Sequence, residues 1–215
     1  MQVPRIYAIA DQDAWGLERL PQAVETLAEA GVGWIQLRVK QAAGGDFQTL
    51  AEKVVRRLEG ADVVLWINDR ADIAGCLEGF GVPIGVHVGQ DDLPPTAVRK
   101  VLGDGVRIGH STHGESQLLA ADAENAVDVI ALGPIYATRS KAQPDPEVGL
   151  QGLRRLRSRT SKPLVAIGGI NAERLPEVLN AGADTVALIS ALGDSEPRGL
   201  AKRVRELIRI AEEAK

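Results

Sequence analysis

Residues 164–171 have the sequence LVAIGGIN, a short apolar run that ends in two glycines. The helical spacing of Leu175, Val178 and Leu179 follows, and Gly182 stands where that helix would end. A short apolar run without polar alternation suits a strand that is buried on both faces of a parallel sheet. Paired glycines let the backbone approach an anion closely, and the start of the next helix adds N–H donors. This stretch therefore predicts a strand–loop–helix unit with a phosphate-binding turn.

The same unit recurs along the chain. Seven further apolar runs bring the expected strands to eight, at residues 6–10, 33–37, 63–67, 85–88, 106–108, 127–132 and 185–189. Amphipathic helical spacings lie between them, such as Leu20, Val24 and Leu27, with Pro21 in the expected first turn. The glycine-rich dinucleotide fingerprint is missing after the first strand. Eight regular units in 215 residues therefore favour an α/β protein, a (β/α)₈ TIM barrel forming a single domain over residues 1–215, rather than an open doubly wound sheet.

Composition excludes several classes of protein. The net charge is -4 with both signs interspersed, so no basic face argues for nucleic acid as a partner. No apolar run has the length of a membrane span and no signal peptide is seen, so we expect a cytoplasmic protein with no membrane partner. The lone cysteine, Cys76, is expected to be a small buried hydrophobe. Whether the chain forms a homo-oligomer stays open.

Polar residues gather directly after the expected strands, at the end of a barrel where enzymes of this fold keep their active sites. Gln36, Arg38 and Lys40 alternate at the end of the second strand, so their side chains share one side. Two cations and an amide there can hold a polyanion and orient a hydrogen-bonding ring. The alternative is an ordinary solvated strand end with surface charges.

Carboxylates follow the third and fourth strands. Asn68 and Asp69 end one strand, and Asp92 follows the next. Mg²⁺ takes few protein ligands, prefers oxygen and accepts phosphate for its remaining positions. Either aspartate alone is better explained as a helix cap, but two at neighbouring strand ends favour a metal site.

The fifth strand leads into Ser111 and His113, with His110 just before them. A histidine in this position can act as an acid or a base. A histidine whose hydrogen bonds are satisfied within the protein explains the pattern equally well.

Two further segments suit phosphate. The longest loop-like stretch, residues 137–149, carries hydroxyls at Thr138 and Ser140 beside Lys141. A phosphate site made by the loops after strands seven and eight recurs in TIM barrels, which points to Gly169 and Ser190.

Together the motifs resemble the thiamine-phosphate synthase (thiamine-phosphate pyrophosphorylase) family over nearly the whole chain. Any one motif is weak, but seven in the family's order are highly specific. They are QLRVK at 36–40, INDR at 67–70, GVHVGQDDLP at 85–94, STH at 111–113, GPIYATRSK at 133–141, AIGGI at 166–170 and ALIS at 187–190. The chain departs from the family pattern at residues 83–85, where Pro-Ile-Gly replaces the usual Ala-Asp-Gly, and at Ser140, where the family has threonine.

The resemblance implies a transferase of thiamine biosynthesis whose partners are two small-molecule substrates. Such an enzyme joins hydroxymethylpyrimidine diphosphate to a thiazole phosphate and releases pyrophosphate, and CO₂ too when the thiazole is carboxylated. In this family, pyrophosphate is thought to leave first, with Mg²⁺ as cofactor. That chemistry needs cations on the leaving group more than it needs a general base.

Residue roles follow by resemblance. The pyrimidine diphosphate is assigned to Gln36, Leu37, Arg38, Val39, Lys40, Asn68, Ser111 and Lys141. Thr138, Arg139, Ser140, Gly169, Ile189 and Ser190 are assigned to the thiazole phosphate, and Asp69 and Asp92 to Mg²⁺. Arg38, Lys40, Ser111 and Lys141 are the expected catalytic residues.

Two alternatives remain. The sister family of thiazole tautomerases shares the fold and isomerises the thiazole carboxylate phosphate with a histidine at the position of His113. Its members typically lack the metal aspartates and the Gln-x-Arg-x-Lys set, which this chain keeps. The other alternative is a barrel that only binds a thiamine precursor, against which the intact metal and diphosphate positions also argue.

Overall fold

The computed structural model describes residues 3–138, 145–193 and 196–214. Within them, eight parallel strands form a closed barrel in chain order, with β8 pairing with β1. The strands are β1 (Ile6–Asp11), β2 (Trp34–Arg38), β3 (Val64–Asn68), β4 (Ile84–Val88), β5 (Arg107–Thr112), β6 (Val129–Leu132), β7 (Leu164–Ile167) and β8 (Thr185–Leu188). The predicted TIM barrel is confirmed.

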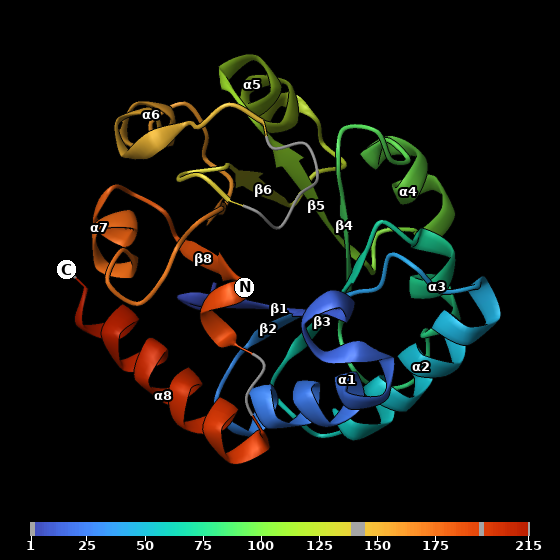
Figure 1. Cartoon of the computed structure of the whole chain (residues 1–215). Coiled ribbons are helices and arrows are strands. Elements are labelled where there is room, and N and C mark those ends of the chain that lie inside the picture. The colour runs from blue at the N-terminus through green and yellow to red at the C-terminus, as the bar shows by residue number, and fades with distance from the viewer. Residues whose placement is uncertain (1–2, 139–144, 194–195, 215) are drawn as a thin grey trace.

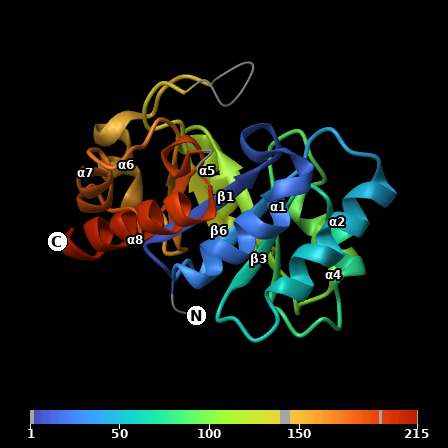
Figure 2. The same ribbon diagram turned by 60° about the horizontal axis from the view of Figure 1, so that its bottom comes forward.

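The helices form a ring around the strands, again in chain order (Figure 1). They are α1 (Gln12–Glu29), α2 (Gly44–Arg57), α3 (Ala71–Cys76), α4 (Pro95–Leu102), α5 (Glu115–Ala123), α6 (Gly149–Arg157), α7 (Leu175–Asn180), the one-turn η1 (Ser190–Leu192) and α8 (Pro197–Glu213). The last helix, α8, runs beside α1, so the outer layer closes as the sheet does (Figure 2).

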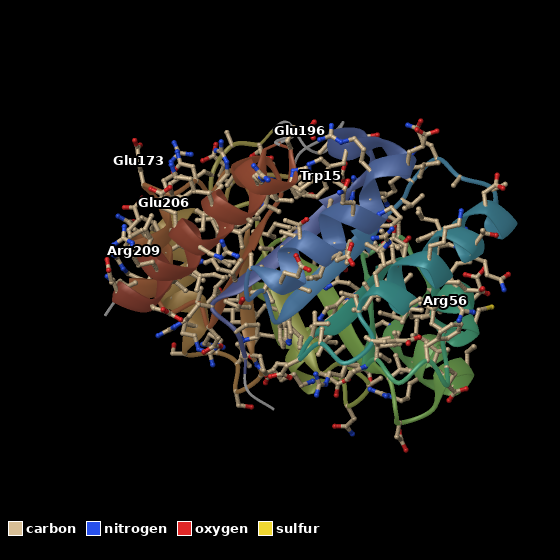
Figure 3. The ribbon with its side chains drawn as sticks, turned by 90° about the horizontal axis from the view of Figure 1, so that it is seen from below. Trp15, Arg56, Glu173, Glu196, Glu206 and Arg209 are labelled. Atoms are coloured by element: carbon tan, nitrogen blue, oxygen red, sulfur yellow. The ribbon has the colours of Figure 1, made fainter. Side chains whose placement is uncertain are left out.

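Amphipathic sequence decides which face each helix buries. In α8, Leu200, Val204 and Leu207 are buried at helical spacing. The charged residues between them face water, and Figure 3 shows Glu206 and Arg209 projecting outward from α8. The outer layer therefore covers the barrel with one apolar stripe per helix.

The barrel interior is filled by a few large rings whose space is provided by glycine. A Cβ on Gly85 in β4 would lie 2.5 Å from the Trp66 ring, and one on Gly109 in β5 would lie 2.5 Å from Nδ1 of His87. Tyr7, Trp34 and Trp66 pack against one another with ring centroids 5.2–5.7 Å apart. These rings fill the part of the barrel near the amino ends of the strands, so the open space lies at the carboxyl ends.

Three local expectations were wrong. Pro21 lies inside α1 rather than in its first turn, because the helix starts directly after β1 and continues past a kink at Gly16. Cys76 is exposed at the end of α3. The fifth strand extends to Thr112, since residues 109–112 stay paired with β6.

The atypical segment at residues 83–85 fits the barrel. Residues 84–88 form β4, which is paired on both sides, and the carbonyl of Pro83 accepts a hydrogen bond from the N–H of Leu65. Across the described part of the chain, no helix combines the length and apolar character that crossing a membrane requires.

Candidate active site

A cavity of about 550 Å³ opens at the carboxyl ends of the strands. The predicted site residues that line it are Gln36, Arg38, Lys40, Asn68, Asp69, Asp92, Ser111, Thr138, Gly169, Ile189 and Ser190. Arg139, Ser140 and Lys141 lie outside the described residues. The volume is that of a small-molecule site, and its place is that of active sites in this fold.

The side chains of β2 that face the cavity are held by residues of β1. Arg38 forms an ion pair with the buried carboxylate of Asp11, which also caps α1 by accepting a hydrogen bond from the N–H of Asp13 at 2.9 Å. Gln36 donates a hydrogen bond from Nε2 to the hydroxyl of Tyr7 at 2.8 Å. The predicted sharing of one side by Gln36, Arg38 and Lys40 is confirmed, since all three line the cavity.

Leu37 and Val39 alternate with these residues and point the other way. Both side chains are buried in the apolar cluster between the strands and the helices. Of these two residues, only the backbone is available to a ligand in the cavity. Their assignment to the pyrimidine diphosphate stays a prediction, and it concerns contacts through the backbone.

The two aspartates lie together. Asp69 has a left-handed backbone, φ 62°, and its N–H donates to the carbonyl of His87 at 2.8 Å. Burial raises the pKa of the Asp69 carboxyl, Lys40 works against this through an ion pair, and Asp92 raises the pKa further. Asp92 accepts a hydrogen bond from the N–H of Gly89 at 2.8 Å.

The alternative of helix capping does not hold for either aspartate. Arg70 and Pro94 occupy the N-cap positions of α3 and α4, and neither helix has a side-chain cap. In the described ranges, no three His, Cys, Asp or Glu side chains cluster as a metal site. Asp92 disfavours ionisation of the neighbouring Asp69, and such a pair of carboxylates suits a cation that takes few protein ligands, as Mg²⁺ does.

Asn68 brings an unpaired donor to the same place. Its Nδ2 is buried and has no hydrogen-bond partner within the described part of the chain. A buried amide left unpaired costs free energy that a bound ligand would recover. This agrees with the prediction that Asn68 contacts substrate.

A network of histidines and glutamine links β4 and β5. Nε2 of His87 lies 3.0 Å from Oγ of Ser111. Gln90 donates from Nε2 to the Ser111 carbonyl at 2.6 Å, and the same nitrogen lies 2.9 Å from Nε2 of His110. Burial lowers the pKa of both His87, to about 4, and His110, so both rings are neutral near pH 7.

The ring of His113 is oriented by a backbone carbonyl in the loop that follows β6. Its Nδ1 lies 2.7 Å from the carbonyl of Gly133, which can only accept, so Nδ1 carries a hydrogen. Nε2 of the neutral ring is then the nitrogen with a lone pair. The ring also lies 3.5 Å from the carboxylate of Asp145.

In the half of the cavity made by β6 to β8, the turn after β7 contributes glycine backbone. Gly168 and Gly169 have positive φ, 104° and 63°, and a Cβ on Gly169 would lie 2.5 Å from the carbonyl of Ala137. Ser190 begins the one-turn helix after β8. Loops after strands seven and eight plus a short extra helix form the recurrent phosphate site of this fold.

Among the site residues that sequence reasoning missed are Tyr7, Asp11 and His87. Tyr7 and His87 line the cavity, and Asp11 holds Arg38. A signal existed for two of them. Asp11 directly follows an apolar strand, and His87 is a polar residue inside an apolar strand, which is the pattern of a side chain that points into a barrel.

The fold and the cavity define a TIM barrel with a small-molecule site at the carboxyl ends of its strands, the place where enzymes of this fold keep their active sites. A family model described as thiamine monophosphate synthase matches residues 6–192. The chain belongs to this family, and it is therefore an enzyme of the transferase class.

Its relatives agree. A thiamine-phosphate synthase of Koribacter versatilis is 46% identical over 89% of this chain and 90% of its own length. One of Albidiferax ferrireducens is 40% identical over 97% and 93%. The solved structure of a thiamine phosphate pyrophosphorylase from Pyrococcus furiosus superposes with a TM-score of 0.85 at 28% identity, covering 98% of this chain and 96% of that one.

Proposed function

We propose that the protein is a thiamine-phosphate synthase that joins hydroxymethylpyrimidine diphosphate to thiazole phosphate, or to its carboxylate, with release of pyrophosphate. One observation carries the proposal. A single cavity holds the cations Arg38 and Lys40 with the carboxylates of Asp69 and Asp92 on its β2–β4 side, and paired glycines on its β7 side. The first group suits a diphosphate with Mg²⁺, and the second suits a phosphate monoester. Family membership supports the same conclusion.

The chain's own cations hold the leaving group. Arg38 and Lys40 line the cavity already oriented by Asp11 and Asp69. Negative charge grows on the pyrophosphate as its bond to carbon breaks, so fixed cations stabilise the transition state more than the bound substrate. Lys141 is proposed to add a third cation from the loop after β6.

Asp69 and Asp92 would hold the Mg²⁺ ion. When bound, the ion would supply positive charge to the phosphate oxygens. The fit rests on two neighbouring carboxylates whose mutual repulsion a cation would relieve.

The bond changes are then as follows. The C–O bond between the pyrimidine methylene and the diphosphate breaks, and its electron pair leaves with pyrophosphate. The electron-rich aminopyrimidine stabilises the carbon cation while Gln36, Asn68 and Ser111 orient the ring. The lone pair of the thiazole nitrogen then forms the new C–N bond. With the carboxylated thiazole, the C–C bond to the carboxylate also breaks, CO₂ leaves, and a proton from water takes its place on the ring carbon. No proton leaves the reacting atoms, so this step needs no general base.

The thiazole phosphate is proposed to lie against Gly169 and Ser190. Ile167 and Ile189 line the cavity beside them and offer an apolar surface to the thiazole ring. Backbone N–H groups at the paired glycines would bind the phosphate without a charged side chain. This arrangement keeps the nucleophile on the opposite side of the cavity from the leaving group.

Turnover with both substrates tests the proposal. Thiamine phosphate and pyrophosphate should form in equal amounts with Mg²⁺, and neither should form in its absence. His113→Ala should leave substantial coupling. Absence of product under all conditions, with tight binding of either substrate, would identify a barrel that only binds.

The tautomerase alternative has its own observation in favour. Nε2 of His113 is the nitrogen with a free lone pair, as a base requires. Isomerisation of the thiazole carboxylate phosphate that disappears in His113→Ala, with no coupling product from the unmodified protein, would replace the proposed function with this one.

A further inference from the structure

The inference concerns His87, a buried side chain to which the proposed mechanism gives no role. It lies on β4, and among the described residues its ring is the only hydrogen-bond partner of the Ser111 hydroxyl, at 3.0 Å. Its other nitrogen, Nδ1, is buried and lacks a hydrogen-bond partner in the ranges that the structure describes. The two nitrogens therefore have unequal surroundings, which decides where the hydrogen of the neutral ring sits.

Nδ1 faces carbon, not an acceptor. A Cβ on Gly109 would lie 2.5 Å from Nδ1, so the nitrogen points at the space that a hydrogen on the Gly109 Cα occupies. The rings of Tyr7 and Trp66 flank His87 with centroids at 6.2 and 6.4 Å. An orphaned buried N–H is rarer than an under-satisfied acceptor, so the lone pair belongs on Nδ1 and the hydrogen on Nε2.

That choice sets the direction of the next hydrogen bond. With its hydrogen on Nε2, His87 donates to Oγ of Ser111. The hydrogen of Ser111 must then point elsewhere, and Ser111 lines the cavity. The described residues offer its hydroxyl no other acceptor.

We propose that His87 is a positioning residue that donates from Nε2 to Ser111 and thereby makes the Ser111 hydroxyl a hydrogen-bond donor to a ring nitrogen of the substrate. The inference rests on the proposed function for the identity of that ring. It adds a prediction of substrate specificity. The site selects the 4-amino pyrimidine, whose ring nitrogen accepts a hydrogen bond, over the 4-oxo form, whose corresponding nitrogen carries a hydrogen. With the oxo form, the Ser111 hydrogen would stay unpaired.

The first test is the tautomer of His87 in the unmodified protein, read from ¹⁵N chemical shifts of labelled histidine. The chain has three histidines, so His110→Phe and His113→Phe assign the remaining signal to His87. We expect a neutral ring with hydrogen on Nε2. A hydrogen on Nδ1, or a charged ring at pH 7, overturns the proposal.

The second test is the binding ratio of the 4-amino and 4-oxo pyrimidine diphosphates, measured by calorimetry without the thiazole substrate. The unmodified protein should prefer the amino form by about tenfold, and Ser111→Ala should lose most of this preference. His87→Phe should lower the preference about fivefold, the equivalent of one ordinary hydrogen bond. The double variant should be no worse than Ser111→Ala, because both changes remove the same bond.

Two controls separate positioning from mere packing. His87→Gln carries an amide N–H that can donate to Ser111 and should recover part of the preference, whereas Trp66→Phe, which changes the packing beside His87 without touching Ser111, should leave it unchanged. An equal preference in His87→Phe and the unmodified protein overturns the proposal. Because neither test uses the coupling reaction, absence of turnover would count against the proposed function alone.

Discussion

Both ends of the barrel carry arginine–aspartate ion pairs, but the pairs are built differently. At the amino end, Asp128 binds Arg99 at 2.8 Å and also accepts from the N–H of Ile108 in β5 at 2.7 Å. Asp184 repeats this arrangement with Arg157, at 2.9 Å, and the N–H of Leu164 in β7, at 2.8 Å. Each pair ties a helix to two adjacent strands.

At the carboxyl end, the pairs join side chain to side chain. Arg38 pairs with Asp11 and Lys40 with Asp69, and within the described part of the chain neither cation donates to a backbone carbonyl. Arg99, in contrast, donates to the carbonyls of Gly103, Val106 and Ala126. At the amino end, Arg99 and Arg157 donate hydrogen bonds to the backbone of the fold. At the carboxyl end, Arg38 and Lys40 retain N–H donors that can bind a ligand.

The largest expected effect tests the carboxyl end. Asp69→Ala and Asp92→Ala should each lower Mg²⁺-dependent coupling at least about 100-fold, since a metal supplies several kcal/mol to the transition state. The melting temperature should change little. The matched control is Asp72→Ala, an exposed carboxylate that pairs with Arg70 outside the cavity. Normal coupling by both site variants would refute the metal assignment.

The second-largest expected effect tests the ion pairs at the amino end of the barrel. Asp184→Ala should destabilise the protein by about 2 kcal/mol, because it removes an ion pair and leaves the N–H of Leu164 unpaired. Thermal unfolding should show a melting temperature lower by roughly 4–8 °C, with the KM for both substrates unchanged at 25 °C. Asp184→Asn keeps an acceptor for Leu164 and should lose less. Asp104→Ala is the control, since that carboxylate is fully exposed beside Arg99.

A smaller effect separates the two substrates. Arg38→Met and Lys40→Met should each raise the KM for the pyrimidine diphosphate about tenfold, the worth of one charge-assisted contact. The KM for thiazole phosphate should stay within about twofold. Steady-state kinetics with each substrate varied in turn would show the split, and equal rises for both substrates would contradict separate subsites.

The smallest effect is a gain in stability. The pKa of Asp69 is raised in the folded protein, so the folded state binds this proton more tightly than the unfolded chain does. The ionised carboxylate therefore costs stability at neutral pH, and the cost disappears as the pH falls through the raised pKa. Asp69→Asn should raise the unfolding free energy by less than about 1 kcal/mol at pH 7 in the presence of a chelator.

Unfolding of both proteins across the acid range would check this sign. The difference between Asp69→Asn and the unmodified protein should shrink as the pH falls. A variant that is less stable at pH 7 would mean that the ion pair with Lys40 outweighs burial.

The cavity-lining residues that could be predicted lie near or just after the carboxyl ends of the strands. Gln36, Arg38, Asp69 and Asp92 stand out because polar side chains interrupt apolar strands at regular places. His87 and Asp11 were missed because they sit inside the apolar runs or at their edge, where a polar residue looks like a local exception. Their roles depend on contacts with Ser111 and Arg38, which lie 24 and 27 positions further along the chain.

The sequence by itself determined the number of strand–helix units, the closed parallel barrel and the end at which polar residues gather. These follow from periodicity and chain length, which are local properties. Only the tertiary structure decided which partner each polar side chain has. Asp11 paired with Arg38, Asp69 lay beside Lys40 and Asp92, and Gly109 left His87 one nitrogen without a hydrogen-bond partner among the described residues. Hydrogen-bond direction and pKa depend on neighbours across strands, and no pattern along one strand specifies them.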